Sequence, residues 1–337
     1  MHEIIEHSHV INGDLPFEMC HASTLLRLED GSIYLAWFAG TKEGEADVDI
    51  WISKKEGDKW KNPFKISDEK EVPHWNPVLL QRGNGDILLF YKVGKLLKEW
   101  YTKVKISKDD GESWGKSFEM VPKDRGGRGP VRNKVILLSN GWLAAPGSTE
   151  NGIWKAFVDI SKDDGESWVK SADIMINNIN DQQVEKVFSD IPVTEQSFKG
   201  RGVIQPSLWE SKPGQIHMLL RSTEGCIYRS DSLDYGITWT EAYPTNLPNN
   251  NSGIDVVKMQ DGTLVLAYNP VGINWGPRTP MVLSVSKDNG LTWHEEIKFE
   301  SDAGEYSYPA IIAVKDEVFV SYTWNRKNIA FWQIRIK

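Results

Sequence analysis

Side chains that could hold an anion and transfer protons recur at one position of this chain. About nine residues before each of six turns, the sequence places His21, Trp75 and Asn76, Arg132 and Asn133, Gln205, Ser252 and Asp255, and Tyr306 and Tyr308. Histidine transfers protons near neutral pH, tyrosine can do so beside an activating neighbour, and arginine grips a carboxylate with two hydrogen bonds. Polar residues at buried positions of a repeat need partners or a ligand. The set therefore predicts a ligand pocket.

The six turns belong to apolar hairpins, which must position these side chains. They lie at Gly31, Gly85, Gly141, Gly214, Gly262 and Asp316, at intervals of 54, 56, 73, 48 and 54 residues. Asn-Gly and Asp-Gly between apolar, β-branched runs are strong hairpin signals. A fixed period of this length, rich in strand formers, predicts the blades of a β-propeller.

A second repeat, Ser-x-Asp-x-Gly-x-x-Trp, supports the same architecture. Complete copies begin at Ser107, Ser161, Ser232 and Ser286, and a copy without the aspartate begins at Ser53. A group that recurs in every unit is a structural device, so we interpret the aspartates as turn-forming and not as catalytic. The tryptophans that end the boxes are expected to pack between the blades.

Six hairpins and five boxes predict an all-β, six-bladed propeller formed by a single domain, residues 1–337. The sixth blade lacks a box, so its last strand is expected from the N-terminal segment near Ile4–Ile11, which would remove open sheet edges. One box interval is 71 residues against 54 elsewhere, and the extra length falls in residues 171–202. This stretch either covers the pocket or mediates dimerisation.

Composition excludes several partners. The formal net charge is −8 and no basic run stands out, which argues against nucleic acid. No apolar stretch is long enough to span a membrane. The N-terminus lacks the pattern of a signal peptide, so a cytoplasmic location is expected. Two cysteines, Cys20 and Cys226, lack metal or redox spacing. Neither a metal nor another cofactor is expected.

Two loops after second strands of blades add candidates. The first loop, FAGTKEGEADVDIW, is expected to place Glu43 and Asp49 at the entrance of the predicted ligand pocket. The second loop, NPVGINWGPRTP, is expected to place Trp275 and Arg278 there. An arginine beside tryptophan and proline is expected to point inwards, where it can hold a carboxylate.

The boxes, together with finer segments, resemble the sialidase (neuraminidase) superfamily over about residues 15–335, in its divergent branch of Asp-box or BNR-repeat propellers labelled predicted neuraminidases. PHWNPVLL and NGWLAAP resemble segments of the second and third blades. The stretch from Asn269 to Trp293 resembles the one with the third arginine of the carboxylate-binding triad, which puts Arg278 in that role. GEYSYPAIIAVKDEVFVSY resembles the segment of the nucleophile, which puts Tyr306 in that role, with Tyr308 facing the same way. Glu43 best matches the acid.

The chain also departs from this family. His21 stands where the resemblance implies the first triad arginine, and Gln205 where it implies the glutamate that activates the tyrosine. Glu305 or Asp255 would then have to serve as the base. Arg221 or Arg229 is the candidate for the second triad arginine, and Arg132 could help Arg278 to grip an acidic sugar.

The favoured interpretation is hydrolysis of a terminal, acidic sugar from a glycan, with a tyrosine nucleophile. One alternative is a polysaccharide lyase, in which His21 and a tyrosine transfer protons while Arg132 or Arg278 neutralises a uronate. Another is a lectin-like propeller that binds glycans through Trp75, Trp100 and Trp275. The substrate-binding prediction also includes Asn76, Asn133 and Asp49.

Overall fold

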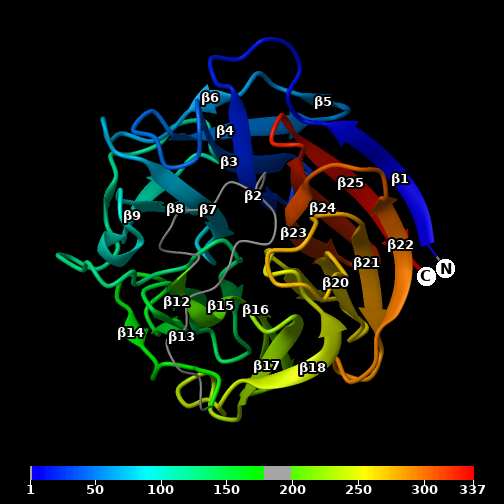
Figure 1. Ribbon diagram of the computed structural model, residues 1–337. Coiled ribbons are helices and arrows are strands. Elements are labelled where there is room, and N and C mark those ends of the chain that lie inside the picture. Colours follow the sequence, from blue (N-terminus) through cyan, green and yellow to red (C-terminus); the bar gives the residue numbers. More distant parts are fainter. Residues whose placement is uncertain (1, 178–198) are drawn as a thin grey trace.

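The structure is a computed structural model that describes residues 2–177 and 199–337. It is built from repeated antiparallel sheets (Figure 1). The first sheet contains β2 (Met19–Arg27), β3 (Ile33–Gly40), β4 (Asp49–Glu56), β5 (Lys59–Trp60) and β6 (Phe64–Lys65). The second contains β7 (His74–Gln81), β8 (Ile87–Val93), β9 (Tyr101–Ser107) and β10 (Phe118–Glu119), with the one-turn 3-10 helix η1 (Leu97–Glu99) between β8 and β9.

The next two units share one ladder. The first of them contains β11 (Ile136–Leu137), β12 (Leu143–Thr149), β13 (Ile153–Ser161) and β14 (Val169–Lys170). The second contains β15 (Arg201–Lys212), β16 (Gln215–Ser222), β17 (Cys226–Ser232) and β18 (Tyr243–Pro248). A short parallel pairing of β13 with β15 joins them. The extra residues predicted between these units lie largely outside the described residues, so their expected role stays a prediction.

The last two sheets bring the two ends of the chain together. One contains β19 (Asp255–Lys258), β20 (Leu264–Tyr268), β21 (Met281–Ser286) and β22 (His294–Glu300). The other contains β23 (Tyr306–Val314), β24 (Glu317–Trp324), β25 (Asn328–Ile336) and β1 (His2–His9). β1 pairs antiparallel with β25, from His2 opposite Ile336 to His9 opposite Ala330. The N-terminal strand thus lies in the same sheet as the C-terminal hairpin.

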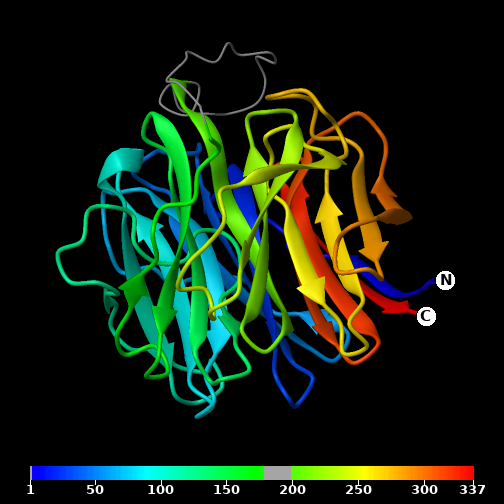
Figure 2. The ribbon, with the colours of Figure 1, turned by 90° about the horizontal axis from the view of Figure 1, so that it is seen from below.

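The predicted all-β class and the repeated antiparallel sheets are confirmed. Figures 1 and 2 show the sheets arranged around a common centre. Apolar side chains of neighbouring sheets form shared clusters. The tryptophans that end the boxes pack against the clusters between neighbouring sheets, as predicted: Trp60, Trp114, Trp168, Trp239 and Trp293. Among the described helices none is long and apolar enough to cross a membrane.

The Ser-x-Asp-x-Gly-x-x-Trp boxes are turns held by their own side chains. In the first complete copy, the amide of Gly111 donates to Ser107 Oγ at 2.8 Å, and the Ser107 hydroxyl donates to Asp109 at 2.8 Å. The indole of Trp114 donates to the carbonyl of Gly111 at 3.1 Å. The same bonds recur in the other complete boxes. The structural interpretation of the box aspartates is therefore correct.

Bulges interrupt the first strand of several units. Strand pairing shifts register between His21 and Thr24, Trp75 and Val78, Ile204 and Ser207, and Ser307 and Ala310. The first bulged residue has a positive φ in each case, at Ala22 (55°), Asn76 (46°), Gln205 (52°) and Tyr308 (56°). Because a bulge re-aims its side chains, these positions decide which residues of the first strands reach the site.

Candidate functional site

Arginines from separate parts of the chain surround the ring of Tyr308. The guanidinium carbons of Arg132 and Arg278 each lie 5.3 Å from the ring centroid, and that of Arg221 lies 5.6 Å away. A fourth arginine, Arg326, comes from the turn between β24 and β25, and its charge raises the cost of protonating the nearby His21. These four arginines and Tyr308 are called the arginine–tyrosine cluster below.

The hydroxyl of Tyr308 is held by an arginine and not by a carboxylate. Arg221 Nη1 donates to Tyr308 Oη at 2.6 Å and to Gln205 Oε1 at 3.2 Å. A second bond, from Arg221 Nε to Asn251 Oδ1 at 2.8 Å, fixes the guanidinium. All three acceptors are neutral groups, so no carboxylate among them balances the charge of Arg221. A cation that donates to a phenol oxygen stabilises negative charge on that oxygen.

His21 completes the inner surface beside this tyrosine. Its ring lies 4.2 Å from the ring of Tyr308, and its Nδ1 is 2.9 Å from Thr323 Oγ1. Burial, followed by the charges of the surrounding arginines, lowers the pKa of His21 well below its usual value. The imidazole is therefore neutral near pH 7, and the surrounding arginines disfavour its protonation.

Two carboxylates balance one side of the cluster. Arg278 Nη1 donates to Glu305 Oε1 at 2.6 Å, and Arg326 Nε donates to both oxygens of Glu305 at 3.0 Å. Arg326 Nη1 also donates to Glu43 Oε2 at 2.5 Å. Burial alone would raise the pKa of Glu305, but the two arginines outweigh it and hold the pKa at about 2. Glu305 is therefore a fixed anion at neutral pH.

Arg132 is the least compensated of these charges. Its side chain is 1 % exposed, and Nη2 donates to the carbonyl of Pro309. Nε and Nη1 have no hydrogen-bond partner within the part of the chain that the structure describes. Burial lowers the pKa of Arg132 to about 10, even though the nearby Asp255 opposes the change. A buried guanidinium with free donors is a ready binding group for an anion.

Asp255 links neighbouring strands through hydrogen bonds. Its Oδ1 accepts from Lys134 Nζ at 2.7 Å and from Ser207 Oγ at 2.5 Å, and its Oδ2 accepts from the amide of Ile311 at 2.8 Å. Asn133 plays a similar part, because its Nδ2 donates to the carbonyls of Gln205 and Pro206. Both residues support the cluster from behind and do not contact Tyr308.

The structure corrects the expectation that Tyr306 and Tyr308 face the same way. Tyr306 packs in the apolar cluster between the last two sheets, with its ring 6.5 Å from that of Trp324, whereas Tyr308 packs in the first such cluster and contacts the arginines. The bulge after Ser307 separates them. The residues expected in one hollow, His21, Arg132 and Arg278, do converge, but around Tyr308 and not Tyr306.

Trp75 belongs to the same apolar cluster as Tyr308, and two other predicted residues, Asp49 and Asn76, lie on β4 and β7. Trp75 is buried against Trp100, with ring centroids 5.1 Å apart, and its indole donates to the carbonyl of Gly94. Asp49 accepts from Ser67 Oγ at 2.7 Å and pairs with a lysine. Asn76 occupies the bulge of β7 and is buried. Of the tryptophans considered for sugar stacking, Trp275 lies beneath Arg221, whose guanidinium carbon is 5.7 Å from its ring.

Sequence reasoning missed Arg326, although a signal existed. Glu43 and Arg278 both lie in loops that follow the second strand of a sheet, β3 and β20. The corresponding loop of the last sheet reads Asn-Arg-Lys-Asn and begins at Asn325. The alternative second arginine, Arg229, lies elsewhere and pairs with Asp231. Within the described residues no group of His, Cys, Asp and Glu could hold a metal ion.

Repeated antiparallel sheets around a site of buried arginines and a tyrosine define a protein with the fold of the sialidases. The chain belongs to the family described as BNR repeat-like domain, whose model matches residues 31–320. The predicted BNR-repeat family is thereby confirmed, and the fold is shared with sialidases. A comparison with curated protein sequences finds no significant match.

Solved structures agree on the fold. A protein of unknown function from Dyadobacter fermentans is 17 % identical, with a TM-score of 0.76, and the match covers 100 % of this chain and 99 % of that one. The NanB sialidase of Streptococcus pneumoniae is 15 % identical, with a TM-score of 0.68 and coverages of 96 % and 71 %. The intramolecular trans-sialidase of Ruminococcus gnavus, in complex with oseltamivir carboxylate, is 13 % identical, with a TM-score of 0.68 and coverage of 95 % of each chain. At these identities the likeness establishes the fold and leaves the activity open.

Proposed function

We propose that this protein is a sialidase-like glycoside hydrolase that removes a terminal, acidic sugar from a glycan. The six repeated units would be the blades of one propeller domain, residues 1–337, closed by β1. The observation that carries the proposal is the charge of the arginine–tyrosine cluster. Among the described residues, no carboxylate is hydrogen-bonded to the buried Arg132 or Arg221, whereas Arg278 and Arg326 share Glu305. Burying such a cation costs free energy of folding unless an anion pairs with it.

The proposed mechanism places the anionic group of the sugar on Arg132, Arg221 and Arg278. Tyr308 then releases its phenolic proton to water and faces the anomeric carbon as the nucleophile, and the bond from Arg221 Nη1 stabilises the phenolate that attacks. Glu43, which Arg326 holds in place, takes up a proton from solvent when the substrate binds and passes it to the leaving oxygen. Water cleaves the glycosyl–tyrosine intermediate, with the residue that acted as the acid now acting as the base.

A specific observation supports the lyase alternative. Gln205 cannot act as a base for Tyr308, whereas the imidazole of His21 lies against the tyrosine ring and is neutral, with one nitrogen free of a proton. In a lyase, the arginines would neutralise the carboxylate of a uronate, His21 would take the proton beside it, and Tyr308 would protonate the leaving oxygen. The product would carry a C4–C5 double bond.

One assay separates the possibilities. Acidic and neutral aryl glycosides and uronate oligosaccharides are incubated with the protein, and both reducing ends and ultraviolet absorbance are followed. Release of an acidic sugar without new absorbance supports the hydrolase, and a rise in absorbance supports the lyase. Binding on a glycan array without turnover supports the lectin and contradicts both enzymes. Tyr308→Phe should lose activity, and Tyr306→Phe, two residues away, is the matched control.

A further inference from the structure

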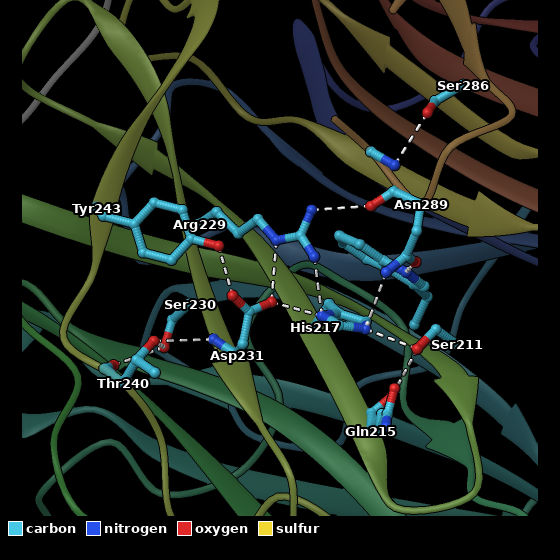
Figure 3. Close-up of polar contacts among 12 residues, drawn as sticks. Ser211, Gln215, His217, Arg229, Ser230, Asp231, Thr240, Tyr243, Ser286 and Asn289 are labelled. Atoms are coloured by element: carbon cyan, nitrogen blue, oxygen red, sulfur yellow. Dashed lines mark hydrogen bonds and ion pairs between the residues drawn. The ribbon is translucent and has the colours of Figure 1, made fainter. Parts of the chain in front are cut away.

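A serine, a histidine and an aspartate form a chain of hydrogen bonds at the other end of β16. Ser211 Oγ lies 2.7 Å from His217 Nε2, and His217 Nδ1 lies 2.5 Å from Asp231 Oδ1 (Figure 3). His217 stands four residues before Arg221 in the same strand, and at about 3.3 Å per residue this separates it from the arginine–tyrosine cluster by roughly 13 Å. The proposed glycosidase mechanism makes no use of these residues.

The hydrogen bonds fix the tautomer of His217. Burial alone would raise the pKa of Asp231, but bonds from His217, Tyr243 and Arg229 outweigh it and hold the pKa at about 2. An ionised carboxylate only accepts, so the contact with Asp231 requires a proton on His217 Nδ1. Arg229 Nη2, which can only donate, also lies 3.0 Å from Nδ1, and its bond would require the other tautomer. We assign the proton to Nδ1 because the distance to Asp231 is the shorter of the two. Nε2 of the neutral ring is then an acceptor, and it faces the hydroxyl of Ser211. The competing acceptor, the carbonyl of Gln215, is further from Ser211 Oγ, at 3.4 Å.

Neighbouring groups hold the imidazole and supply a further donor. The ring of Trp209 stacks on that of His217, with centroids 5.1 Å apart at 29°. Trp209 Nε1 donates to Asn289 Oδ1 at 2.8 Å, which fixes the amide so that Nδ2 lies 3.2 Å from His217 Nε2. Figure 3 shows Ser211 and Asn289 on the same side of the imidazole. When Nε2 becomes protonated it stops accepting, and the Asn289 amide is free to donate to another oxygen.

The serine opens into a cavity that has basic walls. This cavity has a volume of about 510 Å³, which lies in the range of small-molecule sites. Ser211 and Asn289 line it together with Lys212, Lys258 and Lys287. Asp261 is the acidic residue in the lining. Three lysines against one carboxylate favour an anionic ligand.

We propose that Ser211, His217 and Asp231 form a second active site, which hydrolyses esters that carry a negative charge. Ser211 Oγ attacks the ester carbonyl carbon while its proton passes to His217 Nε2. Asn289 Nδ2 donates to the oxyanion of the tetrahedral intermediate. His217 returns the proton to the departing alkoxide, which leaves as an alcohol. Water then cleaves the acyl-serine by the same proton transfers, releasing the acid and restoring Ser211.

The first test is covalent labelling. The full chain is treated with a fluorophosphonate probe, which phosphonylates serines activated by an imidazole, and modified peptides are identified by mass spectrometry. We expect one adduct, on Ser211, and none in S211A. Ser139→Ala is the matched control, because the Ser139 hydroxyl donates to a carboxylate of Glu210 and contacts no histidine. An unlabelled Ser211 in the folded wild-type protein overturns the proposal without any variant.

The second test is turnover. Hydrolysis of p-nitrophenyl acetate should fall by roughly 10²- to 10⁴-fold in S211A and in H217Q. It should fall by roughly 10²-fold in N289A, which loses the oxyanion donor. An equal rate in wild type and S211A overturns the proposal. Glycosidase or lyase activity at the arginine–tyrosine cluster should be unchanged in S211A, so failure of one site does not imply failure of the other.

The charge of the ligand is tested separately. The p-nitrophenyl monoester of succinate carries a carboxylate that the acetate ester lacks. We expect its KM to be several-fold lower than that of the acetate, and we expect Lys212→Glu with Lys287→Glu to remove this preference. Equal KM values for the two esters in the wild type overturn the anionic specificity.

Discussion

Replacing Arg132 by methionine should stabilise the free protein while it abolishes anion binding. Burial lowers the pKa of Arg132 from 12.5 to about 10, and at about 1.4 kcal/mol for each tenfold change in proton affinity the charged side chain costs about 3 kcal/mol. Methionine removes that cost and fills a similar volume. It also loses the bond to Pro309, which contributes about 1 kcal/mol. The net gain is about 2 kcal/mol.

Arg326 provides the opposite case within the same cluster. Its guanidinium bonds to Glu43 and Glu305, and those carboxylates, outweighing burial, raise its pKa. Arg326→Met leaves buried carboxylates with fewer partners and should destabilise the protein by about 3 kcal/mol. The two substitutions are chemically identical, so the sign of the effect depends on whether a carboxylate is hydrogen-bonded to the guanidinium.

Calorimetry with and without ligand measures both effects. For a chain of this size about 2 °C of melting temperature corresponds to 1 kcal/mol, so R132M should melt about 4 °C above the wild type and R326M about 6 °C below it. Acidic monosaccharides should raise the melting temperature of the wild type but not that of R132M. A lower melting temperature for R132M, together with an unchanged response to acidic sugars, would refute the reasoning.

Three other outcomes are expected. Tyr308→Phe should lower the rate of sugar release at least 10²-fold and Tyr306→Phe should leave it within a factor of a few, as measured by kcat on the best glycoside; equal losses would contradict the assignment. The ion pairs of Glu305, whose pKa is lowered from 4.5 to about 2, should contribute about 3 kcal/mol of stability above pH 4.5, lost as the pH falls towards 2. Urea unfolding at pH 5 and pH 3 should therefore show a smaller loss in E305Q than in the wild type. Burial lowers the pKa of Lys92 from 10.5 to about 7, so the folded protein should gain stability as the pH rises from 7 towards 10.5, and melting curves of Lys92→Met should lack this gain.

The sequence analysis did not correctly predict which of the two tyrosines, Tyr306 or Tyr308, faces the arginines. A resemblance of one segment pointed to Tyr306, but the repeat itself contained a better guide. Asn76, Gln205 and Tyr308 each precede a proline, and each has a positive φ in a bulge. Alignment of these X-Pro pairs would have made Tyr308 the equivalent of Gln205, with which it shares Arg221.

No local sequence pattern predicts which residues are hydrogen-bonded to each other across the site. Arg278 and Arg326 share Glu305, and Arg221 bonds to both Gln205 and Tyr308. These contacts join segments that lie far apart in the chain, and nothing in the spacing of the residues says which arginine receives a carboxylate.

The sequence by itself determined the all-β class, the repeated sheets and the structural role of the Asp boxes. Those features follow from local turn chemistry and from a period that is repeated along the chain, so each copy carries the same information. Only the tertiary structure decided that Tyr308 faces the arginines, that Arg326 joins them and that, within the described residues, no carboxylate is hydrogen-bonded to Arg132. Burial and charge balance are properties of neighbours in space, and packing of the sheets around a common centre selects those neighbours.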